Sequence, residues 1–132
     1  MSIDAVREAF AGALSTIDGL NVDPYLVESV RAPHAMVDFE VDYDLTFARG
    51  ADAYTFVVMV FAQRSNAVQA QKFLDRLRDP SDAQSLKQVI EGDDGVAAAV
   101  DYARVLSVTR PQIVTVATAD YLMIEADVEV VI

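Results

Sequence analysis

Apolar residues recur every three or four positions in two long segments, and this spacing predicts amphipathic helices. Ser2 is a suitable N-cap for the first helix, and Gly19 is a suitable stop signal. Ser85 is a suitable N-cap for a shorter helix. Helices are expected over residues 3–17, between Ser65-Asn66 and Asp79-Pro80, over residues 86–91 and, as one helical turn, over residues 96–100.

Two other segments alternate between apolar and acidic residues, which is typical of strands with one buried face and one solvated face. Over residues 35–45 the apolar side comprises Val37, Phe39, Val41, Tyr43 and Leu45, and the acidic side comprises Asp38, Glu40, Asp42 and Asp44. Over residues 121–131 the apolar side comprises Ala126, Val128 and Val130, and the acidic side comprises Glu125, Asp127 and Glu129. Each segment therefore predicts a strand with an acidic face.

The segment 54–62 is apolar on both sides and rich in β-branched and aromatic residues. We expect it to be the central strand of a sheet, covered on both faces by helices of this chain or by a partner subunit. Turns are expected over residues 48–52 and 118–120. A further strand is expected over residues 20–26, at an edge of the sheet because of Pro24. Another is expected over residues 102–109, with Ala103, Val105 and Ser107 on one side. After a bend at Pro111, extended structure is expected to resume over residues 113–117.

The resulting order is α-β-β-β-α-α-β-β, which indicates an α+β fold with a mostly antiparallel sheet flanked by two main helices. The length of 132 residues, or 14.4 kDa, suits a single domain over residues 1–132. No stretch approaches the roughly 18 apolar residues of a membrane span. The chain does not start with a basic region followed by an apolar block, so we expect no signal peptide and folding in a cytoplasm.

Charge removes two classes of function. The chain has 21 acidic and 10 basic residues, which give a formal net charge of -11 at pH 7. A protein that grips nucleic acid needs a basic face to displace the counterions of the phosphates. Docking on an anionic membrane surface needs positive charge as well. We therefore expect neither of these functions.

Residues that support catalysis are scarce. The chain has no cysteine and one histidine, His34, which excludes thiolate metal sites and any site that needs several histidines from one subunit. No serine lies in a Gly-x-Ser-x-Gly motif, and no glycine-rich phosphate loop is present. His34 is expected to be exposed or in a loop. We expect no enzyme activity, no cofactor and no metal site.

The acidic strand faces allow three interpretations. They are solvated sheet surface, or they provide carboxylates for acid–base chemistry or for a hard cation, or they line a surface where negative potential is useful. Arg49-Gly50, at the tip of an expected hairpin, is either a turn device or a contact with a partner. The apolar strand surface is large for a small domain and suits a subunit of an assembly.

The ordered features resemble the tail terminator proteins of long-tailed bacteriophages, especially those of actinobacterial hosts. The resemblance covers nearly the whole chain and depends on the order and spacing of its motifs. A difference from the family lies at Arg110-Pro111-Gln112, where many members have a glycine-rich hairpin. The matching segments are Ile17-Asp18-Gly19-Leu20, Val22-x-Pro24-Tyr25, residues 41–56 (VDYDLTFARGADAYTF), residues 57–62, Arg64-Ser65, Leu74-Asp75, Ser85-Leu86-Lys87, Ile90-Glu91-Gly92-Asp93, Tyr121-Leu122 and Val128-Glu129-Val130.

The resemblance implies a structural virion protein that forms a ring, typically a homo-hexamer, on the end of the completed tail tube. Such a ring ends tube polymerisation and joins the tail to the neck proteins of the head, while DNA passes through its central hole without specific binding. Its partners are other copies of itself, the major tail tube protein and the head–tail connector or neck proteins. Its location is the neck-proximal end of the virion tail, after assembly in the host cytoplasm.

For such a ring we expect acidic side chains on the lumen wall, because an acidic wall repels phosphates. The candidates are Asp38, Glu40, Asp42, Asp44, Glu125, Asp127 and Glu129. The expected ring or tube contact comprises Phe47, Arg49, Gly50 and Asp52. The alternatives are another head–tail joining or tail-completion protein, a small cytoplasmic enzyme with a carboxylate site, and a non-viral adaptor domain.

Overall fold

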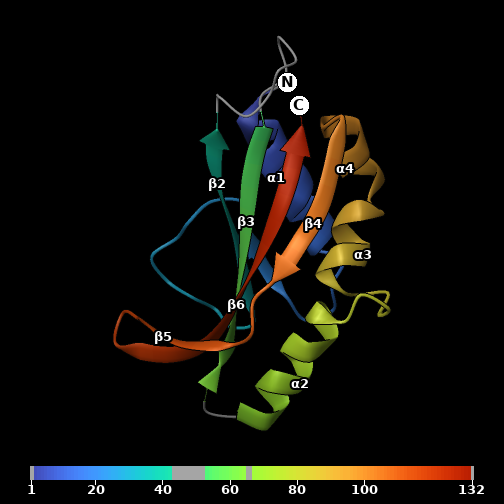
Figure 1. Cartoon of the computed structure of the whole chain (residues 1–132). Helices are drawn as coiled ribbons and strands as arrows, with labels where there is room; N and C mark the ends of the chain where they lie inside the picture. The colour runs from blue at the N-terminus through green and yellow to red at the C-terminus, as the bar shows by residue number, and fades with distance from the viewer. Residues whose placement is uncertain (1, 43–52, 65–66, 132) are drawn as a thin grey trace.

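A computed structural model describes residues 2–42, 53–64 and 67–131 (Figure 1). These residues form four helices and six strands, a mixed α+β fold with a mostly antiparallel sheet, as predicted. The elements are α1 (Ile3–Leu14), β1 (Asn21–Asp23), β2 (His34–Asp42), β3 (Ala53–Gln63), α2 (Ala67–Arg78), α3 (Leu86–Glu91), α4 (Asp94–Ala99), β4 (Tyr102–Val108), β5 (Gln112–Val116) and β6 (Ala119–Val131).

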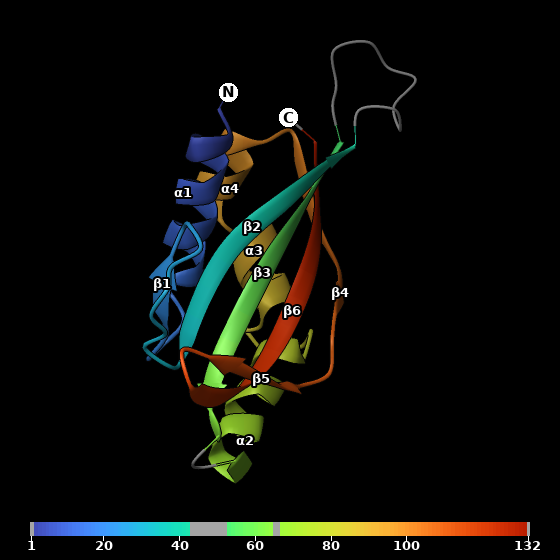
Figure 2. The same cartoon turned by 90° about the vertical axis from the view of Figure 1, so that its left-hand side faces the viewer.

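The sheet has the strand order β1-β2-β3-β6-β4, and β5 pairs with the first half of β6 outside this path. Among the described strands, β1 and β2 form the one parallel pair. The apolar strand β3 has β2 and β6 as its two neighbours, so the prediction of a central strand is confirmed. Helices cover only one face of the sheet: α1, α3 and α4 lie on the same side of β3 and β6 (Figure 2). On the opposite face of β3, no element of the described part of the chain takes the place of the expected second layer.

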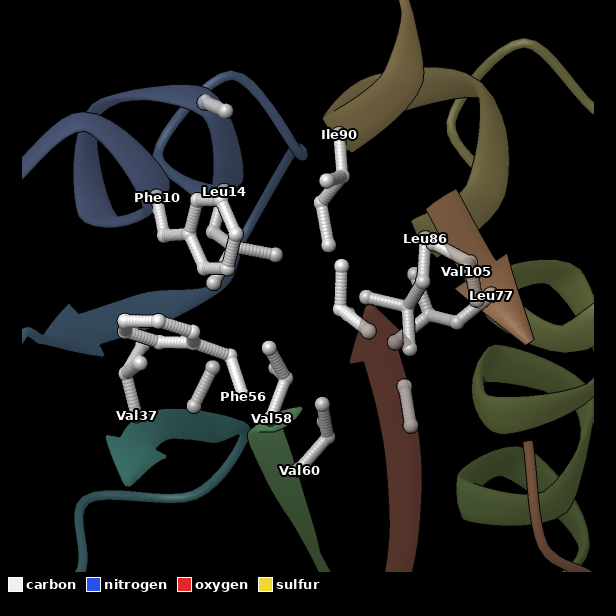
Figure 3. Close-up of a cluster of buried hydrophobic side chains, with 14 of the residues drawn as sticks. Phe10, Leu14, Val37, Phe56, Val58, Val60, Leu77, Leu86, Ile90 and Val105 are labelled. Carbon is white, nitrogen blue, oxygen red and sulfur yellow. The ribbon is translucent and has the colours of Figure 1, made fainter. Parts of the chain in front are cut away.

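One hydrophobic core lies between the helices and the sheet (Figure 3). Phe10 of α1 meets Phe56 of β3 edge to face, with 5.1 Å between the ring centroids. Leu77 of α2 and Leu86 of α3 are buried in the same core. Since the truncation of a buried phenylalanine costs about 3–5 kcal/mol, this packing determines which side of each strand faces the helices.

Local capping explains where the helices begin and end. The hydroxyls of Ser2 and Ser85 accept hydrogen bonds from the backbone of α1 and α3 at 3.2 Å each, as expected from the sequence. Helix α1 ends at Leu14, three residues earlier than predicted, because the N–H of Ile17 turns back to the carbonyl of Leu14 at 3.0 Å. Ile17 nevertheless stays in the core at 2% exposure.

Two expectations about the last strands are wrong. A register shift between Val105 and Ser107 places Ser107 opposite Asp127, so Ser107 does not share the core side of Ala103 and Val105. The last turn lies at residues 117–118, and β6 begins at Ala119. The expected turn over residues 48–52, Tyr43, Leu45 and the cap Ser65-Asn66 lie outside the described residues.

Candidate functional site: the acidic face of the sheet

Five of the predicted lumen acids lie together on one face of the sheet. Their strand neighbours, such as Val37 on β2 and Ile124 on β6, are fully buried in the core, so the acids face away from the helices. We call this set the acidic face: Asp38, Glu40, Glu125, Asp127 and Glu129. The backbone of Asp42 belongs to β2, but its side chain and the whole of Asp44 lie outside the described residues, as do Phe47, Arg49, Gly50 and Asp52.

The central strand β3 separates the two rows of acids. Thr55 is paired with Glu40 on one side and with Glu129 on the other. Val57 is paired in the same way with Asp38 and Asp127. Neighbouring strands lie about 4.8 Å apart, so acids across β3 are separated by roughly 10 Å at their backbones. No two acids of this face are direct cross-strand partners, which keeps their mutual repulsion moderate.

Asp38 is the one member of the acidic face that has an ion-pair partner among the described residues. Its Oδ1 lies 3.4 Å from Nη2 of Arg7, and it also accepts a hydrogen bond from the N–H of Phe39 at 2.8 Å. Both contacts lie at the outer edge of β2, beyond the short β1 pairing at residues 34–36. The charge of Asp38 is therefore partly compensated by the fold.

Arg7 is a residue whose role the sequence interpretation missed. Its side chain is largely buried, and its guanidinium lies 4.9 Å from the ring centre of Tyr25 and 5.1 Å from that of Phe39. Arg7 Nη1 also donates to the carbonyls of Pro24, at 2.8 Å, and Val37. The available signal was its position, three residues before the buried Phe10 on the apolar side of α1.

The other four acids, Glu40, Glu125, Asp127 and Glu129, form no ion pair with any residue that the structure describes. Arg104 of β4 is the cross-strand partner of Glu129, yet the two side chains do not form an ion pair. Apart from Asp38, the carboxylates of this face are therefore not neutralised by ion pairs within the described residues. These carboxylates give this surface a negative electrostatic potential on its solvent side.

The geometry gives less support to carboxylate chemistry. Among the described residues, no group of three or more His, Asp or Glu side chains is placed to hold a metal ion. Successive acids on one strand project about 7 Å apart, and acids on different strands lie farther apart across β3. The described carboxylates are thus spaced as a charged surface and not gathered into one cluster.

His34 is fully buried, so the expectation of an exposed histidine is wrong. Its Nδ1 accepts a hydrogen bond from the N–H of Arg31 at 3.1 Å. Its Nε2 lies 2.6 Å from Oδ2 of Asp23, and because a carboxylate oxygen only accepts, the Nε2–H group donates this hydrogen bond. The ring connects β1, β2 and the segment between them, and this role is structural.

No protein-family model and no curated protein sequence matches the chain. None of the helices that the structure describes is long and apolar enough to cross a membrane.

Proposed function

We propose that this chain is a structural subunit of a long-tailed phage. In this role it forms a ring on the completed tail tube, ends tube polymerisation and provides the surface that joins the head. The acidic face lines the channel of the ring, and DNA passes along it during ejection. The proposal combines the sequence resemblance with one structural observation, namely that five of the predicted lumen acids share one helix-free sheet face.

The electrostatics of this face suit a channel for DNA. Four of its five carboxylates have no ion-pair partner in the described part of the chain, so a phosphate backbone passing nearby meets uncompensated negative charge. Successive acids on one strand, about 7 Å apart, lie within one Debye length, which is about 8 Å at physiological ionic strength, so their potentials add. A wall with lysines or arginines would release counterions from DNA and hold it.

Ring formation increases the negative potential that DNA meets in the channel. Each copy contributes a net charge of -11, and a ring concentrates the acidic faces of all its copies around one axis. The same concentration of charge makes free rings unfavourable at low salt. Assembly on the tube is then the step that supplies the missing stabilisation, because a template that binds the ring shifts the equilibrium toward it.

The decisive experiment is electron microscopy of phage particles assembled without this chain. Overlong tails that are not joined to heads are the expected result. Tails of normal length with unjoined heads would favour the alternative of a neck or tail-completion protein. Normal, fully joined particles would overturn both virion roles.

The role of the acidic face has its own test in particles that contain the triple variant Glu125→Gln, Asp127→Asn, Glu129→Gln. We expect tails of normal length and DNA ejection that is at least several times slower. A matched control removes three acids outside this face, with Glu28→Gln, Asp94→Asn and Asp101→Asn, and should eject DNA at the normal rate. Equal rates for both triple variants would show that the acidic face does not line the DNA path.

A further inference from the structure

The exposed edges of the sheet are not equivalent. An edge strand offers unpaired N–H and C=O groups to any other strand, and proteins usually block such groups with charged side chains or very short strands. At the β2 edge, Arg7 donates to the carbonyl of Val37, and the carboxylate of Asp38 accepts from the N–H of Phe39 at 2.8 Å. Both groups at this position are therefore occupied. The strand beside them, β1, is only three residues long.

The β4 edge is closed by a different charged residue. The N–H of Val105 donates to Oε2 of Glu91, which projects from α3, at 3.1 Å. Lys87, one helical turn earlier, holds the same oxygen at 2.7 Å. Another strand cannot pair here without displacing a carboxylate that already has two partners.

The third edge, the outer side of β5, has no such protection within the described residues. β5 pairs only with β6, and the resulting hairpin lies at the lower end of the sheet (Figures 1 and 2). Its sequence is Gln-Ile-Val-Thr-Val, which contains no charged residue and is rich in β-branched side chains. Ile113 is 57% exposed. An uncharged, β-branched edge is suited to pairing with another strand.

The hairpin geometry shows which backbone groups are free. A two-residue turn at 117–118 makes Val116 and Ala119 the hydrogen-bonded closing pair, and such pairs alternate along the hairpin. The next hydrogen-bonded pair is Val114 with Tyr121. The N–H and C=O groups of Ile113 and Thr115 therefore point away from β6. No residue in the described part of the chain forms a hydrogen bond with them.

We propose that β5 pairs antiparallel with β5 of a second copy of this chain, around a two-fold axis at Val114. In this register Ile113 exchanges its backbone hydrogen bonds with Thr115 of the partner subunit, and Thr115 does the same with Ile113 of the partner subunit. Val114 lies opposite its own copy. All cross-strand pairs are uncharged, and four of the five residues of β5 are β-branched, a combination that stabilises strand pairing.

The distribution of charge favours a second copy of this chain as the partner of β5. Two chains of net charge -11 repel each other over most of their surface. Across residues 109–121, however, Arg110 and Asp120 are the only charged residues and they cancel. Asp120 is moreover tied to Arg64 at 2.9 Å and to the hydroxyl of Thr115 at 2.6 Å, which holds the hairpin in place. The hairpin is thus a neutral site where two copies can meet, and its edge is complementary to itself.

This two-fold contact differs from the head-to-tail contacts of a ring and does not depend on the proposed ring. Pairing is limited to the five residues of β5, because Pro111 has no N–H to extend it. Such an interface is well below about 1,000 Å², so we expect a dissociation constant of about 0.1–1 mM.

The test is analytical ultracentrifugation of the full chain from about 10 µM to about 1 mM. The mean mass should rise from the 14.4 kDa of one chain toward twice that value. Ile113→Lys places a charge on the edge and should abolish the rise, as should Ile113→Pro, which removes a free N–H. Val68→Lys, a control at a residue that is 63% exposed on α2, should leave the rise unchanged. Circular dichroism would establish that each variant is folded.

Amide hydrogen exchange supplies a second readout. Exchange at Ile113 and Thr115 should slow as the concentration of the chain rises, while exchange at Val114, already bonded to β6, should not change. A constant mass of one chain throughout the concentration range would overturn the β5 contact. So would an equal effect of Val68→Lys and Ile113→Lys. A six-fold species that forms without any two-fold species, and that Ile113→Lys leaves intact, would support the ring and reject the β5 contact.

Discussion

Two charged residues occupy backbone groups at the edges of this sheet. Arg7 and Glu91 project from helices, and each forms a hydrogen bond with a backbone group at the edge of a strand. Each satisfies polar backbone groups that would otherwise be open to another strand, which is both a stability effect and a barrier to unwanted association.

Replacement of Arg7 tests the first of these contacts. Arg7→Met keeps the length of the side chain but leaves the carbonyls of Pro24 and Val37 without their donor and Asp38 without its cation. We expect the free energy of unfolding, measured by urea denaturation, to fall by about 2–3 kcal/mol. Arg76→Met is the control, because its ion pair with Asp82 is long, at 3.8 Å, and largely exposed. It should cost less than about 1 kcal/mol, and equal losses would show that Arg7 is no more than a surface charge.

The hydrogen bonds of Glu91 should make the stability of the fold depend on pH. Burial by itself raises the pKa of Glu91, but the hydrogen bonds from Lys87 and from the N–H of Val105 outweigh burial and lower this pKa below its ordinary value. A carboxyl whose pKa is lowered in the folded state contributes stability at pH values above its unfolded pKa. This contribution is lost as the pH falls below about 4.5 and the carboxyl is protonated.

The corresponding variant is Glu91→Gln, which keeps an oxygen acceptor for Val105 but cannot be protonated in this range. We expect its free energy of unfolding to fall less steeply with pH, between about pH 5 and pH 3, than that of the unmodified chain. Urea denaturation at a series of pH values measures the slope. Glu28→Gln, in an exposed loop, should leave the slope close to its original value. An unchanged slope for Glu91→Gln would contradict the proposed contact.

At the scale of elements, both strands of the β5–β6 hairpin were predicted, but the position of its turn was not. Its turn residues Ala117 and Thr118 have φ angles of 47° and 71°, a region that favours Asn and Gly. Asn-Gly is the usual signal for such a turn, and its absence explains why the turn was predicted at residues 118–120. The alternation of strand residues was more informative, because core packing enforces it on β2 and β6.

Substitutions that relieve the strain in this turn should stabilise the fold. Ala117→Asn combined with Thr118→Gly relieves the left-handed conformation, which costs roughly 1–2 kcal/mol for each ordinary residue. We expect the free energy of unfolding to rise by about 1 kcal/mol, as measured by thermal and urea denaturation. Ala119→Gly, at the neighbouring strand position, should instead be neutral or destabilising. A loss of stability in the double variant would show that the turn is not held in this conformation.

At the scale of the whole molecule, the sequence predicted which residues alternate but not which strands are neighbours. The acids of residues 35–45 and 121–131 were recognised separately, and only the pairing of both strands with β3 brings them to one face. The burial of His34 and the role of Arg7 were missed for the same reason. Each depends on partners 11 to 31 residues away, namely Asp23 for His34 and Asp38 for Arg7, and local periodicity contains no information about such contacts.

The net negative charge of the whole molecule should make its stability depend on salt. Four of the acidic-face carboxylates lack ion-pair partners in the described part of the chain, so they add to the self-repulsion of a chain with net charge -11. We expect the free energy of unfolding to rise when NaCl is increased from about 0.05 M to about 0.5 M, because salt screens this repulsion.

The triple variant Glu125→Gln, Asp127→Asn, Glu129→Gln should be more stable than the unmodified chain at low salt, by about 1 kcal/mol, and should respond less to NaCl. Urea denaturation at the two salt concentrations measures both effects. A variant that is less stable at low salt would show that these carboxylates are bound within the fold. If the variant is more stable, the acidic face reduces the stability of the chain, and its presence then requires a reason outside folding. A channel that must not bind DNA provides such a reason.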